Sequence, residues 1–172
     1  MEPLRKWQSD AGGRDGRTAM RIYSEYIRKA QNQVADQTEK LNTLFNGTDG
    51  FLRTLRCSAQ RQTSIEPGGY ILRINYYLSR LSAAREELSG ALELLKAAGA
   101  CRDASSIQLS MIQAEQMVLA IDSEAAVLRK CRDDLVIFMQ AQRQSADTAD
   151  VNALKDFRNA LRRYEDEKEK NT

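Results

Sequence analysis

The side chains that most often carry catalysis or bind metals are scarce in this 172-residue chain. Histidine is absent, which removes the commonest general base and the commonest imidazole metal ligand. The three cysteines, Cys57, Cys101 and Cys131, lie far apart and form no Cys-x-x-Cys pair. We therefore expect no enzyme activity, no cofactor and no bound metal, and we interpret the cysteines as small hydrophobic residues of an intracellular protein.

Two further patterns could suggest chemistry, but each has a simpler explanation. The glycine-rich segment 12–16 has no preceding strand and lacks the Lys-Ser/Thr pair that a phosphate-binding loop requires. Carboxylates such as Glu86, Glu87 and Glu115 fall within segments of helical periodicity, where acidic side chains are expected on the surface. Neither pattern predicts an active site.

Arginine is concentrated between residues 51 and 85, where Glu66 is the single acidic residue. A patch for an acidic partner could use Arg53, Arg56, Arg61, Arg73 and Arg80. Tyrosines at positions 70, 76 and 77 lie among these arginines, and the two residue types together can also grip phosphates and stack on bases. The net charge of the whole chain is only +2, below that of a dedicated nucleic-acid binder. An acidic protein partner, contact with nucleic acid and a solvated face around core tyrosines all remain open.

Apolar residues recur at alternating spacings of three and four, which predicts long amphipathic helices with coiled-coil seams, the lines of core positions along each helix. Such spacing extends over residues 20–44, 71–95 and 107–139, and over the shorter segment 154–164. Only 6% of residues are aromatic and only two are proline, which also favours helices over strands. We predict an all-α fold, an elongated antiparallel bundle or coiled coil of three long helices plus one or two short ones.

Glycine, proline and cap-forming residues set the predicted limits of these helices. Residues 46–50, Asn-Gly-Thr-Asp-Gly, predict a turn followed by a short helix up to about Arg61. A break is also expected at Pro67, and another after Gly99, where Asp103 or Ser105 could cap the next helix. The predicted organisation is a flexible N-terminal arm (1–16), a helical bundle (17–164) and a charged disordered tail (165–172).

Three polar residues occupy seam positions where the pattern calls for an apolar side chain: Gln37, Arg85 and Arg132. A buried polar group in a seam lowers stability but can determine the register or the partner. A long arginine side chain can also reach sideways to solvent. We therefore predict a role in specificity for these residues, with a solvated side chain as the alternative.

Two segments carry apolar residues that could form a binding surface for another protein. The third long helix is longer than the others, and its far end contains five consecutive apolar residues: Leu135, Val136, Ile137, Phe138 and Met139. Such a run covers more than one face of a helix, so either the final helix or a partner must bury the second face. The N-terminal arm contains Leu4 and Trp7, residue types that anchor interfaces. Both segments are predicted to bind a partner.

We hypothesise a non-enzymatic coiled-coil interaction protein, a subunit or adaptor of an intracellular assembly that binds other protein chains through helical faces. A small helical chaperone for a secretion or assembly substrate is one alternative, and a nucleic-acid accessory protein using residues 53–85 is another. Homodimerisation through the seams is compatible with each. The first 20 residues lack the apolar run of a signal peptide, and no stretch is apolar enough to span a membrane, so a cytoplasmic location is expected.

Overall fold

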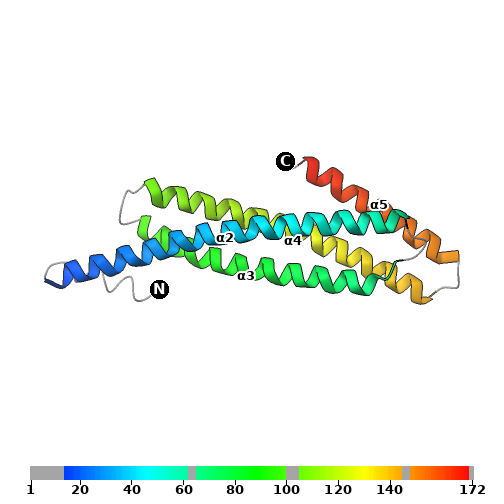
Figure 1. Cartoon of the computed structure of the whole chain (residues 1–172), viewed down its shortest axis with the longest axis horizontal. Helices are drawn as coiled ribbons and strands as arrows, with labels where there is room; N and C mark the ends of the chain where they lie inside the picture. Colours follow the sequence, from blue (N-terminus) through cyan, green and yellow to red (C-terminus); the bar gives the residue numbers. More distant parts are fainter. Residues whose placement is uncertain (1–13, 62–64, 100–104, 145–147, 171–172) are drawn as a thin grey trace. The chain divides into compact units, whose positions relative to one another are not determined.

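A computed structural model describes residues 14–61, 65–99, 105–144 and 148–170. These residues form the helices α2 (Arg14–Arg61), α3 (Pro67–Gly99), α4 (Ser105–Gln144) and α5 (Thr148–Lys170), which are labelled in Figure 1. No strand occurs within the described ranges. The prediction of an all-α helical bundle is confirmed.

Several helix limits follow the local sequence signals. Helix α3 begins at Pro67, a residue suited to the first helical position because it has no N–H group that would need a partner. The carboxylate of Glu66 accepts a hydrogen bond from the backbone N–H of Gly68 at 3.4 Å, which satisfies one of the unpaired donors of this first turn. Helix α3 ends at Gly99 and α4 begins at Ser105, as the glycine and the serine predicted.

The turn predicted at residues 46–50 is wrong, because α2 continues through this segment to Arg61. The prediction that α4 is the longest helix is therefore wrong too, since α2 has 48 residues and α4 has 40. A Cβ atom at Gly47 would lie 3.6 Å from the ring of Tyr77, whose hydroxyl donates a hydrogen bond to the Gly47 carbonyl at 3.3 Å. Thr48 is buried, and its hydroxyl donates to the Phe45 carbonyl at 2.9 Å, within the same helix. The Tyr77 side chain of α3 therefore packs on this segment while it is helical, and the short helix expected after the turn is the last part of α2.

Gly50→Ala tests the continuity of α2. Nothing lies within 4 Å of the position that a Cβ would take at Gly50, so alanine should raise the free energy of unfolding by about 0.5–1 kcal/mol, the gain expected in a helix interior. Urea denaturation would measure the change. Gly90→Ala is the matched control, since it is equally open and lies within α3. If Gly50→Ala lowers stability and Gly90→Ala does not, residues 46–50 form the turn predicted from the sequence and not a continuous helix.

The outer limits of the helical region also differ from the prediction. Helix α2 begins at Arg14, inside the segment that was expected to be a flexible arm. Helix α5 extends to Lys170, whereas residues 165–172 were expected to be a disordered tail. Glutamate and lysine both have high helix propensity, so a charged composition does not by itself end a helix.

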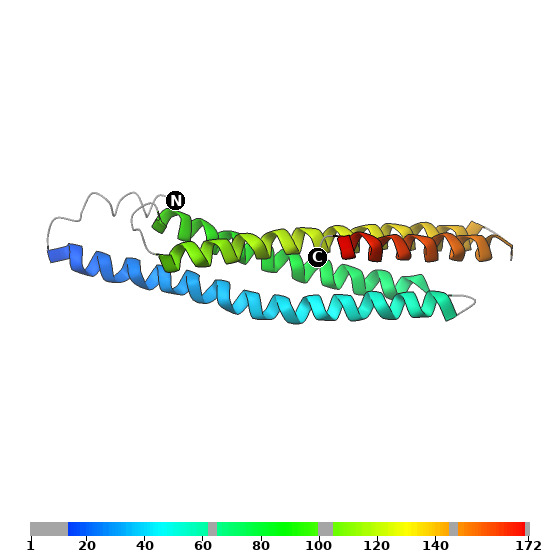
Figure 2. The same ribbon diagram turned by 90° about the horizontal axis from the view of Figure 1, so that it is seen from above.

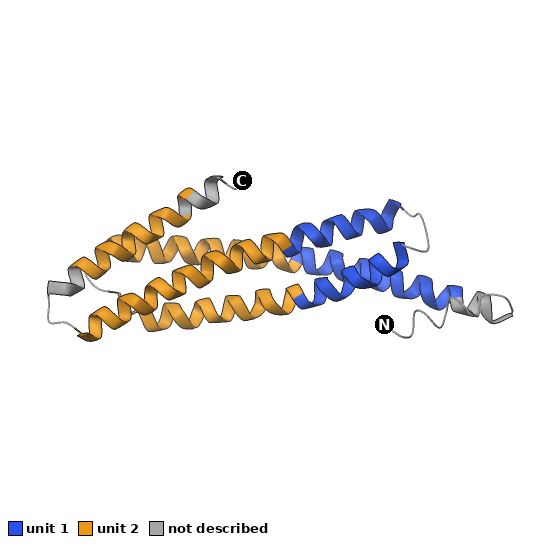
Figure 3. Ribbon diagram, turned by 180° about the vertical axis from the view of Figure 1, so that it is seen from behind, with its two compact units in different colours: residues 1–39, 86–118 blue, residues 40–85, 119–172 orange. Residues whose placement is uncertain are grey.

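Contacts between helices divide the chain into two compact units, coloured separately in Figure 3. Unit 1 comprises residues 1–39 and 86–118, and unit 2 comprises residues 40–85 and 119–172. The sequence predicted one bundle over residues 17–164. Helices α2, α3 and α4 each contribute residues to both units.

Unit 1 contains the beginning of α2, the end of α3 and the beginning of α4. An ion pair joins Lys96 Nζ to Glu115 Oε1 at 3.1 Å, and a Cβ at Gly99 would lie 3.6 Å from the sulfur of Met111. These two contacts show that α3 and α4 are antiparallel here, because the residue number falls on one helix as it rises on the other. The buried apolar residues are Ala30, Val34, Leu88, Ala91, Leu95, Ala98, Ile107 and Ala114.

Unit 2 contains the end of α2, the beginning of α3, the end of α4 and all of α5 within its described residues. Figure 2 shows α5 alongside the second half of α4, where the rings of Phe138 and Phe157 stack with their centroids 5.9 Å apart. The guanidinium of Arg158 on α5 donates to the Ala59 carbonyl on α2. Helix α5 therefore packs against both α2 and α4, and the largest fully buried apolar side chains of the unit are Leu41, Leu55, Ile74, Leu81, Ile121, Leu128 and Leu135.

Candidate functional site

The apolar run at residues 135–139, predicted to bind a partner, is largely covered by the chain's own fold. Leu135 and Phe138 are buried in the core of unit 2, and Phe138 is stacked on Phe157 of α5. Val136 and Met139 are half-buried, and only Ile137 is exposed, at 63%. The sequence left two possible covers for the second face, the final helix or a partner, and the final helix α5 buries it. Leu135 and Phe138 are therefore core residues and not a free surface.

The other predicted anchors, Leu4 and Trp7, lie outside the described residues. Their role in binding remains a prediction from the sequence alone.

Gln37, the first of the polar seam residues, is buried in unit 1. Its side-chain amide donates to the carboxylate of Glu87 on α3. The amide of Gln33, one turn earlier on α2, donates to the backbone carbonyl of Glu87 at 3.5 Å. A polar side chain in the α2 seam is thus matched by a polar partner on α3, which favours one register of the two helices.

Arg85 and Arg132 reach the surface instead of entering the core. Arg85 forms a two-pronged ion pair with Asp122 of α4, with Nε–Oδ1 and Nη2–Oδ2 distances of 2.8 and 3.2 Å. The hydrogen bond from Arg85 lowers the pKa of the Asp122 carboxyl. Arg132 pairs with its neighbour Asp133 at 3.1 Å. Selection of a partner by these arginines stays a prediction, because both are engaged within the chain itself.

A buried polar pair in unit 2 was not identified from the sequence. The hydroxyl of Thr48 on α2 donates to the carboxylate of Glu124 on α4 at 2.5 Å, and both residues are buried. A signal was present, because Glu124 follows Ile121 by three residues and precedes Leu128 by four, the spacing of a core face. A glutamate at such a position needs a polar partner, which the pattern on one helix cannot reveal.

Another polar contact in unit 2 joins Asp134 of α4 to Tyr164 of α5. The hydroxyl of Tyr164 donates to its carboxylate, and Lys130 Nζ lies 5.3 Å from the centroid of the Tyr164 ring. Burial raises the pKa of the Asp134 carboxyl, and the neighbouring Asp133 adds to this shift, whereas Lys130 and Arg163 oppose it. The folded state therefore binds a proton at Asp134 more readily than the unfolded chain does.

The raised pKa of Asp134 predicts a specific pH dependence. Its contribution to stability is fully present below the ordinary aspartate pKa and is lost as the pH rises through the raised value. Asp134→Asn keeps an acceptor for the Tyr164 hydroxyl and should be at least as stable as the wild type at neutral pH. Thermal unfolding between about pH 3 and pH 8 would measure the difference. Asp156→Asn, an exposed change on α5, is the control, and a wild-type advantage over Asp134→Asn that grows as the pH rises would contradict this account.

The described cysteines are free thiols. Cys131 is fully buried, and its pKa is raised to about 12 by burial and by the negative charge of Asp134. It is therefore a protonated core residue at neutral pH. Cys57 is half-buried, and Cys101 lies outside the described residues.

The arginines predicted to form one acidic-partner patch are divided among three places in unit 2. Arg53 and Arg56 help to line a pocket of about 230 Å³. This pocket lies among α2, α4 and α5 and is also lined by Asp49, Leu52, Val127, Leu161 and Tyr164. Arg61 is the last residue of α2, and Arg73 and Arg80 are exposed on α3. The five arginines therefore lie on two helices of unit 2, and their use as one patch for an acidic partner stays a prediction.

Apolar and basic side chains occur together on the outer face of α3, defined here by Leu72, Arg73, Tyr76 and Arg80. Leu72 is 72% exposed and Tyr76 is 58% exposed, although both are large apolar side chains. Arg73 and Arg80 are exposed beside them, since residues three and four apart are neighbours on a helix. The adjacent Tyr77 is buried, so of these two consecutive tyrosines Tyr76 lies on the surface and Tyr77 lies in the core.

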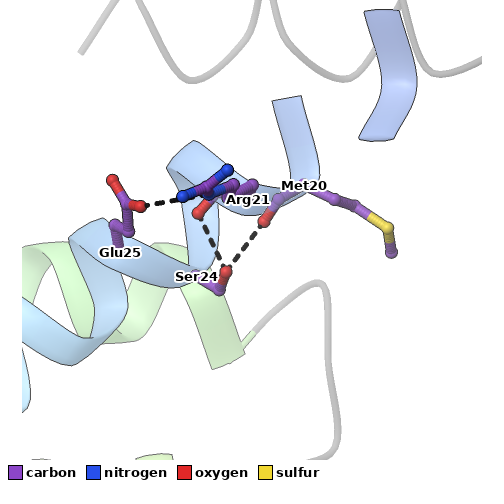
Figure 4. A network of polar contacts seen from close by, with 4 residues as sticks. All are labelled: Met20, Arg21, Ser24 and Glu25. Carbon is purple, nitrogen blue, oxygen red and sulfur yellow. Dashed lines mark hydrogen bonds and ion pairs between the residues drawn. The ribbon is translucent and has the colours of Figure 1, made fainter. Parts of the chain in front are cut away.

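Unit 1 also exposes large apolar side chains, but the polar contacts beside Met20 are local. Figure 4 shows the Ser24 hydroxyl donating to the Met20 and Arg21 carbonyls at 3.0 and 2.9 Å, while Arg21 pairs with Glu25 at 3.6 Å. The Met20 side chain extends away from this group. Further exposed apolar residues of the unit are Tyr26, Leu94, Leu109 and Ile112.

Within the described ranges, no group of three or more Cys, Asp or Glu side chains is placed to hold a metal ion. None of the helices in this part of the chain combines the length and the apolar character needed to cross a membrane. The chain matches no known protein family, curated protein or solved structure. Its function must therefore be inferred from its own surfaces.

Proposed function

We propose that this chain is a non-enzymatic interaction protein, a subunit or adaptor that binds other proteins through the faces of its helices. The observation that carries the proposal is the pair Leu72 and Tyr76, two large side chains that are exposed on one face of α3. Single exposed apolar residues are common on any protein. Two at a spacing of four form a short apolar stripe, the feature that amphipathic helices use to bind one another.

A second pair in unit 1 supports the same proposal. Leu109 and Ile112 are exposed three residues apart on α4, which again places them on one helical face. Burial of apolar surface contributes about 25 cal/mol per Å², before the cost of ordering the two partners is subtracted. A reducing, intracellular location belongs to the proposal too, and the free thiols of Cys57 and Cys131 are compatible with it.

The test compares what copurifies with tagged forms of the full chain from its own cells. One variant replaces the two apolar pairs by serine: Leu72→Ser, Tyr76→Ser, Leu109→Ser and Ile112→Ser. The control carries Ser82→Ala and Gln140→Ala, exposed polar positions on the same two helices that are not three or four residues from any replaced position. Thermal unfolding first establishes that both variants fold.

We expect quantitative mass spectrometry to find at least one protein that copurifies in a constant ratio with the wild type and with the control. The amount of this protein that copurifies with the serine variant should be reduced. A chain that copurifies with nothing in constant ratio would contradict the proposal. So would a partner that is recovered equally with all three forms.

A further inference from the structure

The outer face of α3 differs in charge from two exposed apolar positions on α4. Residues 67–85 contain three arginines and no aspartate or glutamate. Ile112 and Ile137, two exposed apolar residues of α4, each have an acidic neighbour three or four positions away, Glu115 and Asp133 respectively. The α3 outer face is therefore apolar and cationic at once, whereas Ile112 and Ile137 on α4 have acids beside them.

Contacts inside unit 2 hold this face in a defined conformation. The ring of Tyr76 meets the ring of Tyr77 edge-on, with their centroids 5.7 Å apart. Tyr77 is in turn held by the ring of Phe51 at 5.6 Å and by its hydrogen bond to the Gly47 carbonyl. The guanidinium of Arg73 lies over the other side of this cluster, 6.0 Å from the centroid of the Phe51 ring. A side chain that is already ordered loses less conformational entropy when a partner binds it.

We infer that the α3 outer face binds an acidic amphipathic helix of another protein, an inference that rests on the proposed function and specifies its partner. Apolar residues of that helix would cover Leu72 and Tyr76, the two large apolar side chains exposed on this face. Its glutamate or aspartate side chains would pair with Arg73 and Arg80. Charge complementarity of this kind selects the partner and its orientation more than it adds to affinity.

Nucleic acid fits this face less well than an acidic helix does. Tyr76 offers one exposed ring for base stacking, but Leu72, which is 72% exposed, offers neither charge nor a ring. Arg73 and Arg80 are the two cationic side chains of this face. Tight binding of a phosphate backbone usually uses more cationic side chains than two.

Site-specific photocrosslinking in the source cells tests the inference directly. The full-length chain carries Tyr76→p-benzoylphenylalanine, an aromatic replacement that crosslinks whatever lies against position 76 on irradiation. The same replacement at Ile137, which is exposed but has acidic neighbours, is the matched control. Mass spectrometry then identifies the crosslinked peptide.

We expect position 76, and not position 137, to crosslink a peptide of another protein that has helical apolar spacing and more acidic than basic residues. Adding Arg73→Glu and Arg80→Glu should reduce the yield by at least about tenfold, the scale expected from like-charge contacts. Arg73→Lys with Arg80→Lys should retain most of it. A peptide without an acidic excess, a second copy of this chain or nucleic acid at position 76 would overturn the inference.

Failure of this inference can be told apart from failure of the proposed function. A partner that copurifies in constant ratio but does not crosslink at position 76 would overturn only the assignment to the α3 outer face. Absence of any copurifying partner would overturn both.

Discussion

Phe138→Ala is expected to lower the free energy of unfolding by about 3–5 kcal/mol, the range observed when a buried phenylalanine is truncated. Phe138 lies in the core of unit 2 and stacks on Phe157, so its loss removes apolar burial and leaves a cavity between α4 and α5. Urea denaturation followed by circular dichroism measures the change. This substitution should have the largest effect among those proposed.

Ile137→Ala is the matched control for Phe138→Ala. The two residues are neighbours in sequence, but Ile137 is 63% exposed, so its truncation should change stability by no more than about 0.5 kcal/mol. Equal effects of the two substitutions, or a negligible effect of Phe138→Ala, would show that α5 does not cover α4 as described.

Thr48→Val is expected to lower the free energy of unfolding by about 1–3 kcal/mol. Valine has nearly the same shape as threonine and the same branching, so packing and helix propensity change little. The carboxylate of Glu124, however, would lose the donor that lies 2.5 Å away in the core of unit 2. Loss of a partner by a buried acceptor costs more than the hydrogen bond itself contributes.

Thr54→Val on the same helix separates this effect from a general intolerance of valine. The Thr54 hydroxyl is exposed, and it donates to the Gly50 carbonyl of its own helix at 2.9 Å. Its replacement should alter stability by no more than about 0.5 kcal/mol. If both threonine substitutions have the same effect, the contact between Thr48 and Glu124 does not stabilise the packing of α2 on α4.

The sequence predicted the helices well wherever a local signal decides the outcome. Pro67 cannot continue a hydrogen-bonded ladder from the preceding residues, so α3 begins there whatever packs around it. Gly47 and Gly50 do not decide the outcome in this way, because glycine suits a tight turn but is also tolerated inside a helix. Packing on α3 accompanies the helical conformation, since the Tyr77 hydroxyl donates to the Gly47 carbonyl. Tyr77 lies 30 positions from Gly47 along the chain, so no local sequence pattern includes both residues.

The candidate sites were harder to predict, because they depend on which helices become neighbours. Five consecutive apolar residues correctly indicated that the end of α4 needs a second covering element. The pattern could not distinguish α5 of the same chain from a foreign helix, and Phe138 is covered by α5. Similarly, Arg53 and Arg73 are close in sequence, but one lines the pocket at α5 and the other lies over the Phe51 ring.

The molar mass of the chain as isolated from its cells tests most directly whether it works by binding other proteins. Size-exclusion chromatography with light scattering, followed by identification of the components, would measure it. We predict a complex heavier than the 19.4 kDa of the chain, containing a second polypeptide in fixed ratio. A single species of 19.4 kDa, with no second polypeptide at any concentration measured, would contradict that function.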